Sequence, residues 1–505
     1  MLTGVARGGS RAFGGTSAAA VLGFGLTLVV TRGLDGASAG QFFSATALFL
    51  VLQTLFAFGV AAGVVRFVPR LRALGREADV PALLILAVVP VAVAALAGAV
   101  VLWFSSSALA GVFDNGVSES NVSSFRLLSL FLFPGVLEIV AVECTRAFGN
   151  ITRYVLIQQI FLPLSRPVLV LLALALDAPL WGIVLAWLLP LLFALGLAFL
   201  VVTRAMTSSF GTPLPWPTRT KPLPALAREY WLFTGARGIA SIVDILLTWL
   251  DVLIVAAVVS ASQAAIYAAA SRFITSGTLV LQALRLSIAP ELSAALARND
   301  KARAGEMYRV STQWVLLSSW PLYIVMGVFA PTVLGLFGAG YTSGATAMSI
   351  LCAAMLVAMA AGNVGTVLLM GGKSSWVLGD KIVVLGINVA ANVLLIPPMG
   401  ISGAALAWAI TIVIDSAIAF AQVQWGLGLS SRGRAIFLAA GLAAGCYAGG
   451  GLAVRAIWGS NLTTLVLSTL AISALYLALV WRKRDLLDLP MLLAGLRAER
   501  LGPSG

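Results

Sequence analysis

The amino-acid sequence predicts an all-α integral membrane protein with about fourteen transmembrane helices, and three observations support this fold class. Of its 505 residues, 60% are hydrophobic and only 10% are charged, which is far from the composition of a soluble domain. The apolar residues fall into segments of about 20, the length that a helix needs to cross a bilayer. Basic residues gather in alternate loops, as expected of a chain that crosses a membrane repeatedly.

The predicted spans follow one another along the chain with short connections. The first leads directly into the second, so we do not interpret it as a cleaved signal peptide. The spans are expected at residues 15–33, 40–66, 81–105, 124–147, 151–176, 179–203, 232–258, 264–291, 313–337, 343–370, 375–396, 401–426, 435–457 and 461–481.

Loop charge predicts the orientation of these spans. Most of the 32 basic residues lie at the two termini or in the connections after even-numbered spans. Cytoplasmic loops carry such an excess of Lys and Arg, so both termini are expected in the cytoplasm, with the chain crossing the cytoplasmic (inner) membrane as a monomer. The net charge of +13 then reflects topology and contact with membrane lipids, and no nucleic-acid partner is expected.

The reactive side chains exclude several kinds of chemistry. There is no histidine, which excludes zinc–histidine sites, histidine-dependent nucleophilic catalysis and histidine proton relays. Cys144, Cys352 and Cys446 lie in or beside apolar spans without metal-ligand spacing, as expected of small core residues. We therefore predict no enzymatic activity, no cofactor and no certain metal site, and any coupling to Na⁺ or H⁺ would have to use carboxylates.

Two pairs of distant segments resemble each other at a similar offset. VVTRGLDGASAGQFFSATALF (29–49) aligns with LIVAAVVSASQAAIYAAASRF (253–273), and WGIVLAWLL (181–189) aligns with SGAALAWAI (402–410). These matches predict two six-helix repeats that point the same way, followed by two C-terminal helices. In carriers built from such repeats, the substrate site lies near the bilayer midplane between the repeats.

The repeat predicts five parts of the chain. They are an N-terminal six-helix bundle (1–203), a proline-rich cytoplasmic linker (204–228), a C-terminal six-helix bundle (229–426), two additional helices (427–481) and a cytoplasmic amphipathic tail (482–505).

The sequence also resembles a known family. The segments VVTRGLDGASAGQFFSATALF, FGVAAGVVRFVPRLRALG, LTWLDVLIVAAVVSASQAAIYAAASRF and GISGAALAWAI are similar to the polysaccharide-exporter (oligosaccharide flippase) branch of the multidrug/oligosaccharidyl-lipid/polysaccharide (MOP) exporter superfamily. The match is partial after the first span, where members commonly have a Gly-Pro-Glu-like turn and this chain has Leu34-Asp35-Gly36-Ala37.

The resemblance implies a function and its partners. Such a protein moves a polyprenyl-pyrophosphate-linked oligosaccharide, the precursor of a cell-surface polysaccharide, across the membrane by alternating access, beside the glycosyltransferases and polymerase of its pathway. Two alternatives from the same superfamily are a peptidoglycan lipid-precursor flippase and a cation-coupled multidrug antiporter. Alternatives of other classes are a membrane glycan polymerase and a non-transporting scaffold.

The seventh predicted span carries a polar stripe. Arg237, Ser241, Asp244, Thr248 and Asp251 are spaced by three or four residues, which places them on one helical face. Because a charge at a helix centre costs about 2.5 to 3.5 kcal/mol on insertion scales, we expect this face to line the bundle interior or a water-filled cavity. Alternatively, Arg237 and Asp251 reach the two interfaces, which would leave only Asp244 buried and paired.

Arginines are the candidates for substrate binding, because guanidinium groups hold phosphate oxygens bidentately. Arg11 aligns with Arg237 in the repeat, and Arg66, Arg272 and Arg285 are further candidates. The alternative for Arg11 and Arg66 is an anchor on lipid phosphate, and for Arg285 it is an ion pair with Glu291.

Carboxylates and amides are the candidates for cation coupling. Asp244 and Asp251 are joined by Asn388, Asn392, Thr411 and Asp415 of the eleventh and twelfth spans. This set resembles the cation site of some family members, although hydrogen bonding between helices is the alternative. Two other pairs are expected to be structural, namely Glu138 with Arg166 and Asp380 with Lys381.

Overall fold

The computed structural model describes residues 2–113, 119–149, 151–210, 223–431 and 433–487. Over these residues every regular element is helical. The chain divides by its internal contacts into two compact units, 1–268 and 269–505, which are considered separately below. The predicted tail from residue 488 onwards and residues 211–222 of the predicted linker lie outside the described residues. The five predicted parts therefore stay a prediction.

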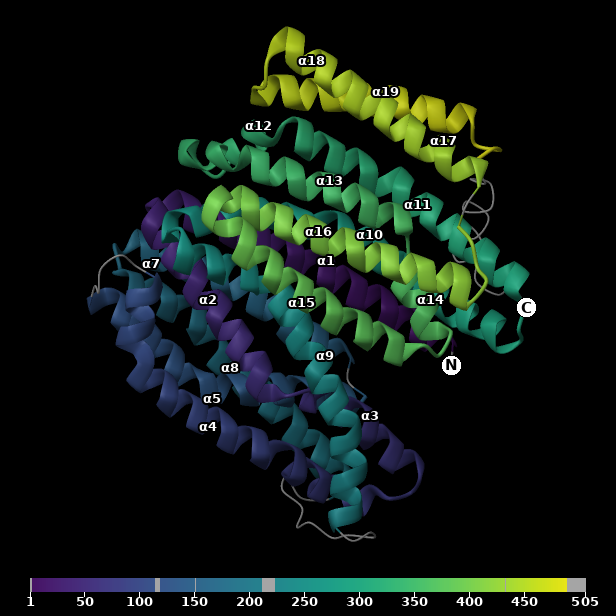
Figure 1. Cartoon of the computed structure of the whole chain (residues 1–505). Coiled ribbons are helices and arrows are strands. Elements are labelled where there is room, and N and C mark those ends of the chain that lie inside the picture. The colour runs from purple at the N-terminus through teal and green to yellow at the C-terminus, as the bar shows by residue number, and fades with distance from the viewer. Residues whose placement is uncertain (1, 114–118, 150, 211–222, 432, 488–505) are drawn as a thin grey trace. The chain divides into compact units, whose positions relative to one another are not determined.

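Unit 1 (1–268) is a helix bundle in which α5 lies beside α4 and α8 (Figure 1). Its helices are α1 (Leu2–Gly33), α2 (Gly36–Ala57), α3 (Val60–Ala73), α4 (Val80–Phe113), α5 (Glu119–Ala147), α6 (Ile151–Tyr154), α7 (Leu162–Ala175), α8 (Leu180–Phe210) and α9 (Leu223–Val258). α5 packs against α2, α3, α4 and α8, while α9 packs against α2 and α3. The core includes Phe49 and Trp187, whose rings meet edge to face at 5.8 Å.

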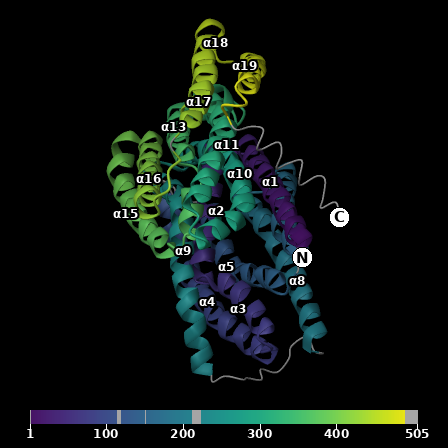
Figure 2. The ribbon, with the colours of Figure 1, turned by 90° about the vertical axis from the view of Figure 1, so that its right-hand side faces the viewer.

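Unit 2 (269–505) contains most of α10 and all of the later helices. Those helices are α10 (Ala261–Ala297), α11 (Lys301–Val328), α12 (Ala330–Gly335), α13 (Ala345–Ala361), α14 (Val364–Met370), α15 (Ser374–Met399), α16 (Ile401–Ala421), α17 (Arg434–Ala443), α18 (Gly450–Trp458) and α19 (Leu462–Arg482). α15 and α16 lie side by side in Figures 1 and 2, and α13 packs against both α11 and α16.

The order of helix packing recurs in the two units. In unit 1 the third predicted span packs on the fourth, the fourth on the sixth and the fifth on the sixth, through α4, α5, α7 and α8. In unit 2 the same pairs form six spans later, through α11, α13, α15 and α16. A repeat of six helices would give this arrangement.

The number of spans falls below the sequence prediction. Twelve helices in the described chain are long and apolar enough to cross a membrane, or thirteen if the two bent halves of α10 form one span. The predicted span at 313–337 is not among them, because it is divided between α11 and α12. α11 buries Thr312, Gln313 and Ser319 within the protein, so its polar side chains need not meet lipid. The fourteen-span arrangement is therefore not confirmed.

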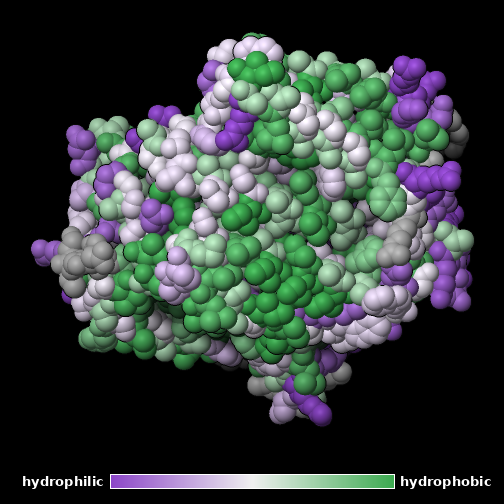
Figure 3. Space-filling model, turned by 45° about the horizontal axis from the view of Figure 1, so that its top comes forward, coloured by the Kyte–Doolittle hydropathy of each residue, from purple (hydrophilic) through white to green (hydrophobic). Residues whose placement is uncertain are grey.

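Apolar side chains cover much of the surface, as expected of helices that face lipid. On the face shown in Figure 3, hydrophobic residues form broad continuous areas and strongly hydrophilic residues gather mainly near the margins. α4 is the clearest case, since Val93 and Phe104 expose 63% and 79% of their surface. Together with the apolar helices, this surface supports a multi-pass membrane protein.

The second predicted span is broken, which sets the course of α3. Phe58 and Gly59 both have positive φ angles, of 38° and 73°, and they separate α2 from α3. Asp35 caps the other end of α2, where its carboxylate accepts hydrogen bonds from the backbone N–H of Ala37 and of Ser38, at 3.0 and 3.2 Å. The cap and the break fix where α2 begins and where α3 turns towards α9.

Candidate functional site

α3 and α9 pack antiparallel in unit 1 and bring two predicted substrate-binding arginines close together. The Arg66 guanidinium of α3 lies 4.1 Å from the ring centroid of Phe233 on α9. Arg237 follows Phe233 by one helical turn, so it lies on the same face of α9 as the ring that Arg66 contacts. Both arginines are exposed, and within the described residues neither forms an ion pair. We call Arg66 and Arg237 the arginine pair.

The neighbouring contact on this seam differs because it is already neutralised. Arg70, one turn from Arg66, forms a 2.8 Å ion pair with Glu229, one turn from Phe233. Along the seam, Arg70 is therefore neutralised by Glu229, whereas the two members of the arginine pair keep their charge without a carboxylate partner among the described residues. Unpaired guanidinium groups can bind an anion that enters from outside the protein.

Small residues allow α3 and α9 to approach this closely. A Cβ atom added to Gly238 would lie 2.7 Å from the Phe58 carbonyl oxygen, and one added to Gly63 would lie 2.7 Å from the Tyr230 hydroxyl. The Tyr230 hydroxyl donates a hydrogen bond to the Val60 carbonyl at 3.3 Å. The close approach thus depends on the glycines, and it holds Arg66 over α9.

The polar stripe of α9 is partly accessible and partly buried. Arg237, Asp244 and Thr248 are exposed, whereas Asp251 retains only 4% exposure. The buried Asp251 accepts a hydrogen bond from the Tyr267 hydroxyl of α10 at 3.1 Å. The alternative in which Asp244 is the buried member is therefore wrong, because Asp251 is the buried carboxylate and Asp244 is exposed.

The remaining predicted arginines are not placed beside the arginine pair by any described contact. The side chain of Arg11 lies outside the described residues, although the backbone of α1 is described there. Arg272 and Arg285 lie on the part of α10 that belongs to unit 2, where Arg272 is half-buried and Arg285 is exposed. Glu291 pairs with Arg303 at 3.6 Å instead of with Arg285. The role of these three arginines in substrate binding stays a prediction.

The predicted polar residues of unit 2 meet between α15 and α16. Asn388 donates to the Thr411 hydroxyl at 3.3 Å, and Asn392 donates to the Asn388 carboxamide oxygen at 3.1 Å. Asp415 lies one turn beyond Thr411, and its carboxylate pairs with Lys381 at 3.2 Å. The structure thus joins these four residues in one polar ladder that already contains a cation, the Lys381 ammonium.

The predicted local pair of Asp380 with Lys381 is not a direct ion pair, although the two charges act on each other through space. Asp380 accepts a 2.7 Å hydrogen bond from Gln422, while Lys381 reaches Asp415. Consecutive residues on a helix point about 100° apart. Lys381 therefore reaches α16, whereas Asp380 reaches Gln422 in the segment that follows α16.

Glu138 and Arg166 form a buried polar centre in unit 1. Glu138 is 2% exposed, and the Arg166 guanidinium lies 4.1 Å from the ring centroid of Trp187. Their opposite charges act on each other, but Glu138 Oε1 and Arg166 Nε make no hydrogen bond. The predicted ion pair is thus a through-space attraction, with the guanidinium stacked on an indole.

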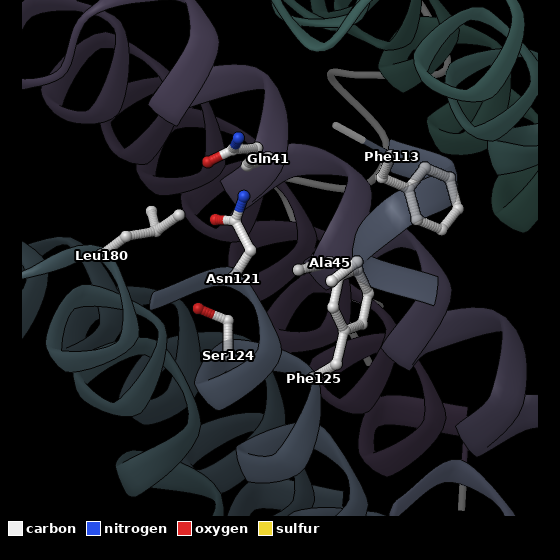
Figure 4. Close-up of a pocket in the computed structure, with 8 residues that line it drawn as sticks. Gln41, Ala45, Phe113, Asn121, Ser124, Phe125 and Leu180 are labelled. Carbon is white, nitrogen blue, oxygen red and sulfur yellow. The ribbon is translucent and has the colours of Figure 1, made fainter. Parts of the chain in front are cut away.

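A small cleft at one end of unit 1 is too small for a substrate. Gln41, Asn121 and Ser124 turn their polar groups towards it from α2 and α5, while Phe113, Phe125 and Leu180 also line it (Figure 4). Its volume is about 10 Å³, which is the room needed by one water molecule. We therefore assign the candidate site to the arginine pair.

Sequence reasoning missed the partners that organise these residues. Phe233 and Glu229 of α9 were not singled out, and Lys381 of α15 was assigned to Asp380 instead of Asp415. A four-residue spacing that joins Glu229, Phe233 and Arg237 was a usable signal, because it places all three on one face. No local signal indicated that Lys381 reaches across to α16.

Comparison with known proteins places this architecture. A family model of polysaccharide biosynthesis proteins matches residues 5–293, and a search of curated proteins finds no match. Among solved structures, the inward-closed lipid II flippase MurJ is similar with a TM-score of 0.69 and 10% identity, over 93% of this chain and 97% of that one.

Two further structures are MATE transporters, the first of which is a multidrug resistance transporter. An inward-facing member has a TM-score of 0.65 and 14% identity, over 82% of this chain and 94% of that one. VcmN of Vibrio cholerae has a TM-score of 0.54 and 16% identity, over 84% of this chain and 98% of that one. At these identities the likeness shows the fold, which is that of MOP-superfamily transporters. Because the family match spans more than half of its length, this chain belongs to the polysaccharide biosynthesis protein family.

Proposed function

We propose that this protein is a flippase that moves a polyprenyl-pyrophosphate-linked oligosaccharide across the cytoplasmic membrane by alternating access. Two findings support the proposal. The family is that of polysaccharide biosynthesis proteins, and the fold is shared with a lipid II flippase. The sugar and lipid would then come from glycosyltransferases, and the flipped product would pass to a polymerase.

The arginine pair is the observation that carries this proposal. A pyrophosphate bears several negative oxygens, and a guanidinium presents a planar fork that can bind two of them. Arg66 and Arg237 come from different helices and share one face, so together they could hold both phosphate groups. Stacking of Arg66 on Phe233 fixes one guanidinium without using its N–H donors.

Alanine and lysine variants of the arginine pair test this assignment. In cells that lack the chromosomal gene, Arg66→Ala or Arg237→Ala should leave lipid-linked oligosaccharide on the cytoplasmic side, measured by mass spectrometry of extracted lipids. Loss of one charge-assisted contact of about 1.5 to 3 kcal/mol predicts export about tenfold slower or more. Arg237→Lys should restore only part of the export, because an ammonium cannot bind bidentately.

A matched control separates the arginine pair from overall charge. Arg204→Ala removes one exposed arginine of α8 and should export at the wild-type rate. Normal export by both alanine variants of the pair would place the headgroup elsewhere. If gene deletion changed drug resistance without any accumulation of lipid-linked sugar, the multidrug antiporter would be the correct function.

Asp244 is our proposed coupling residue if transport uses a cation gradient. It is the exposed carboxylate of the α9 stripe, whereas Asp251 is buried and Asp415 is paired with Lys381. Asp244→Asn keeps a polar side chain of nearly the same shape, so the variant should fold. In reconstituted vesicles it should lose stimulation by Na⁺ or by a pH gradient, and unchanged stimulation would exclude Asp244 as the coupling site.

Orientation in the membrane is tested by labelling introduced cysteines. We expect a cysteine at Ser262 to react from outside the cell and one at Ser208 to react only after permeabilisation. Ser208 is exposed, whereas Ser431 is 4% exposed and is a poor position for labelling. External labelling at Ser208 would reverse the proposed orientation.

A further inference from the structure

An apolar groove runs between α4 and α5 on the surface of unit 1. Its volume is about 320 Å³, and its walls include Leu96, Val100, Trp103, Phe104 and Leu130. Phe104 and Leu130 expose 79% and 59% of their surface, so the groove is open along its length. It lies on two helices that are apolar enough to span a membrane, where hydrocarbon chains are the surrounding solvent.

The groove offers almost no polar group to an occupant. Its one polar lining residue is Ser129, which is 2% exposed and donates its hydroxyl to the Arg126 carbonyl at 2.6 Å. That hydrogen bond satisfies the hydroxyl within α5, so the groove wall behaves as a hydrocarbon surface. A straight apolar chain fits such a wall, whereas a sugar or a polar peptide would lose hydrogen bonds to water.

One exposed cation lies at one end of this groove. Arg126 precedes Leu130 by one helical turn, and its guanidinium lies 5.5 Å from the ring centroid of Trp103, which lines the groove. Among the described residues, Arg126 forms no ion pair with a carboxylate. A guanidinium stacked on an indole keeps its N–H donors, which remain available to an anion.

We propose that this groove binds an anionic phospholipid, with an acyl chain against Val100 and Leu130 and the phosphate on Arg126. Charge complementarity decides the occupant, because the apolar groove ends at Arg126, which forms no ion pair within the part of the chain that the structure describes. The position of Arg126 agrees with a headgroup, since it lies about two turns from the start of α5, beside a tryptophan of the kind enriched at membrane interfaces. This lipid site does not depend on the proposed flippase function.

Native mass spectrometry of the detergent-purified protein tests the site, with phosphatidylglycerol and phosphatidylcholine as probes. Wild type should retain phosphatidylglycerol more tightly than phosphatidylcholine. Arg126→Gln should weaken phosphatidylglycerol binding about tenfold and leave phosphatidylcholine unchanged, because only the charge-assisted contact is lost. Ala99 also lines the groove, so Ala99→Trp fills it and should remove the high-affinity phosphatidylglycerol adduct.

Matched controls are available on lipid-facing or exposed positions of the same unit. Arg204→Gln makes the same charge change on α8, and Val168→Trp places the same indole at an exposed position of α7, so both should bind as wild type does. Melting temperatures of all variants establish that each remains folded.

Three outcomes would overturn the proposal. Unchanged phosphatidylglycerol binding by folded Arg126→Gln would remove the headgroup contact, and unchanged binding by folded Ala99→Trp would remove the groove. Displacement of phosphatidylglycerol by equimolar undecaprenyl phosphate, but not by phosphatidylcholine, would assign the groove to an isoprenoid lipid instead.

Discussion

Substitution of Gly238 tests whether the close approach of α3 and α9 builds the arginine pair. In Gly238→Ala the new methyl group would lie 2.7 Å from the Phe58 carbonyl oxygen and 2.9 Å from its carbonyl carbon. These are backbone atoms at the left-handed break between α2 and α3, so they cannot rotate away as a side chain would. We expect this overpacking to cost about 1 to 3 kcal/mol, partly offset by about 1 kcal/mol of improved helix propensity.

Gly235 supplies a control on the same helix. A Cβ atom added there meets nothing within 4 Å, so Gly235→Ala gains the helix propensity without the clash. The difference between the two variants therefore isolates the clash, at about 1 to 3 kcal/mol. Thermal unfolding in detergent can be followed with a thiol-reactive fluorophore, because Cys144 and Cys352 are buried until the chain unfolds.

The expected result is a lower melting temperature for Gly238→Ala and an equal or higher one for Gly235→Ala. Gly238→Ala should also slow export, because displacing α9 from Phe58 moves Arg237 relative to Arg66. Equal melting temperatures would refute the close approach. A destabilised variant with normal export would refute the link between the seam and the arginine pair.

Two further predictions concern buried charge and helix capping. Glu138→Ala should destabilise the protein by about 1 to 3 kcal/mol and lower its melting temperature, since it leaves a cavity at a side chain that is only 2% exposed and removes the charge near Arg166, whereas Glu138→Gln should cost less; equal melting temperatures for wild type and Glu138→Ala would contradict this. The Ser38 hydroxyl and backbone N–H donate hydrogen bonds to the Asp35 carboxylate and hold its pKa below the ordinary value. The ionised carboxylate therefore stabilises the folded state, and this stabilisation is fully present at pH values above the unfolded pKa of about 3.9. Asp35→Ala should lower the free energy of unfolding by about 1 kcal/mol at pH 7. Melting curves should show this loss of stability shrinking as the pH falls below about 4 through the folded pKa, and a loss that grew on acidification would contradict the cap.

The sequence alone determined the class of protein and the candidates for its site. Apolar segments of bilayer length predict membrane helices because the requirement is local, one residue after another. The spacing of Arg237, Asp244 and Asp251 likewise determines that they share a face of α9, since helical periodicity is fixed. The predicted span at 313–337 is divided between α11 and α12, and only the tertiary structure shows that its polar residue Gln313 is buried in protein.

Only the tertiary structure decided which of these residues meet. Arg66 reaches the face of α9 that carries Phe233 and Arg237 because Gly63 and Gly238 let α3 and α9 approach, and the two arginines are 171 positions apart in the chain. Lys381 pairs with Asp415 instead of its sequence neighbour for the same kind of reason. A helix fixes the direction of each side chain, but the partner in that direction belongs to another helix, and its position depends on the packing of the whole unit.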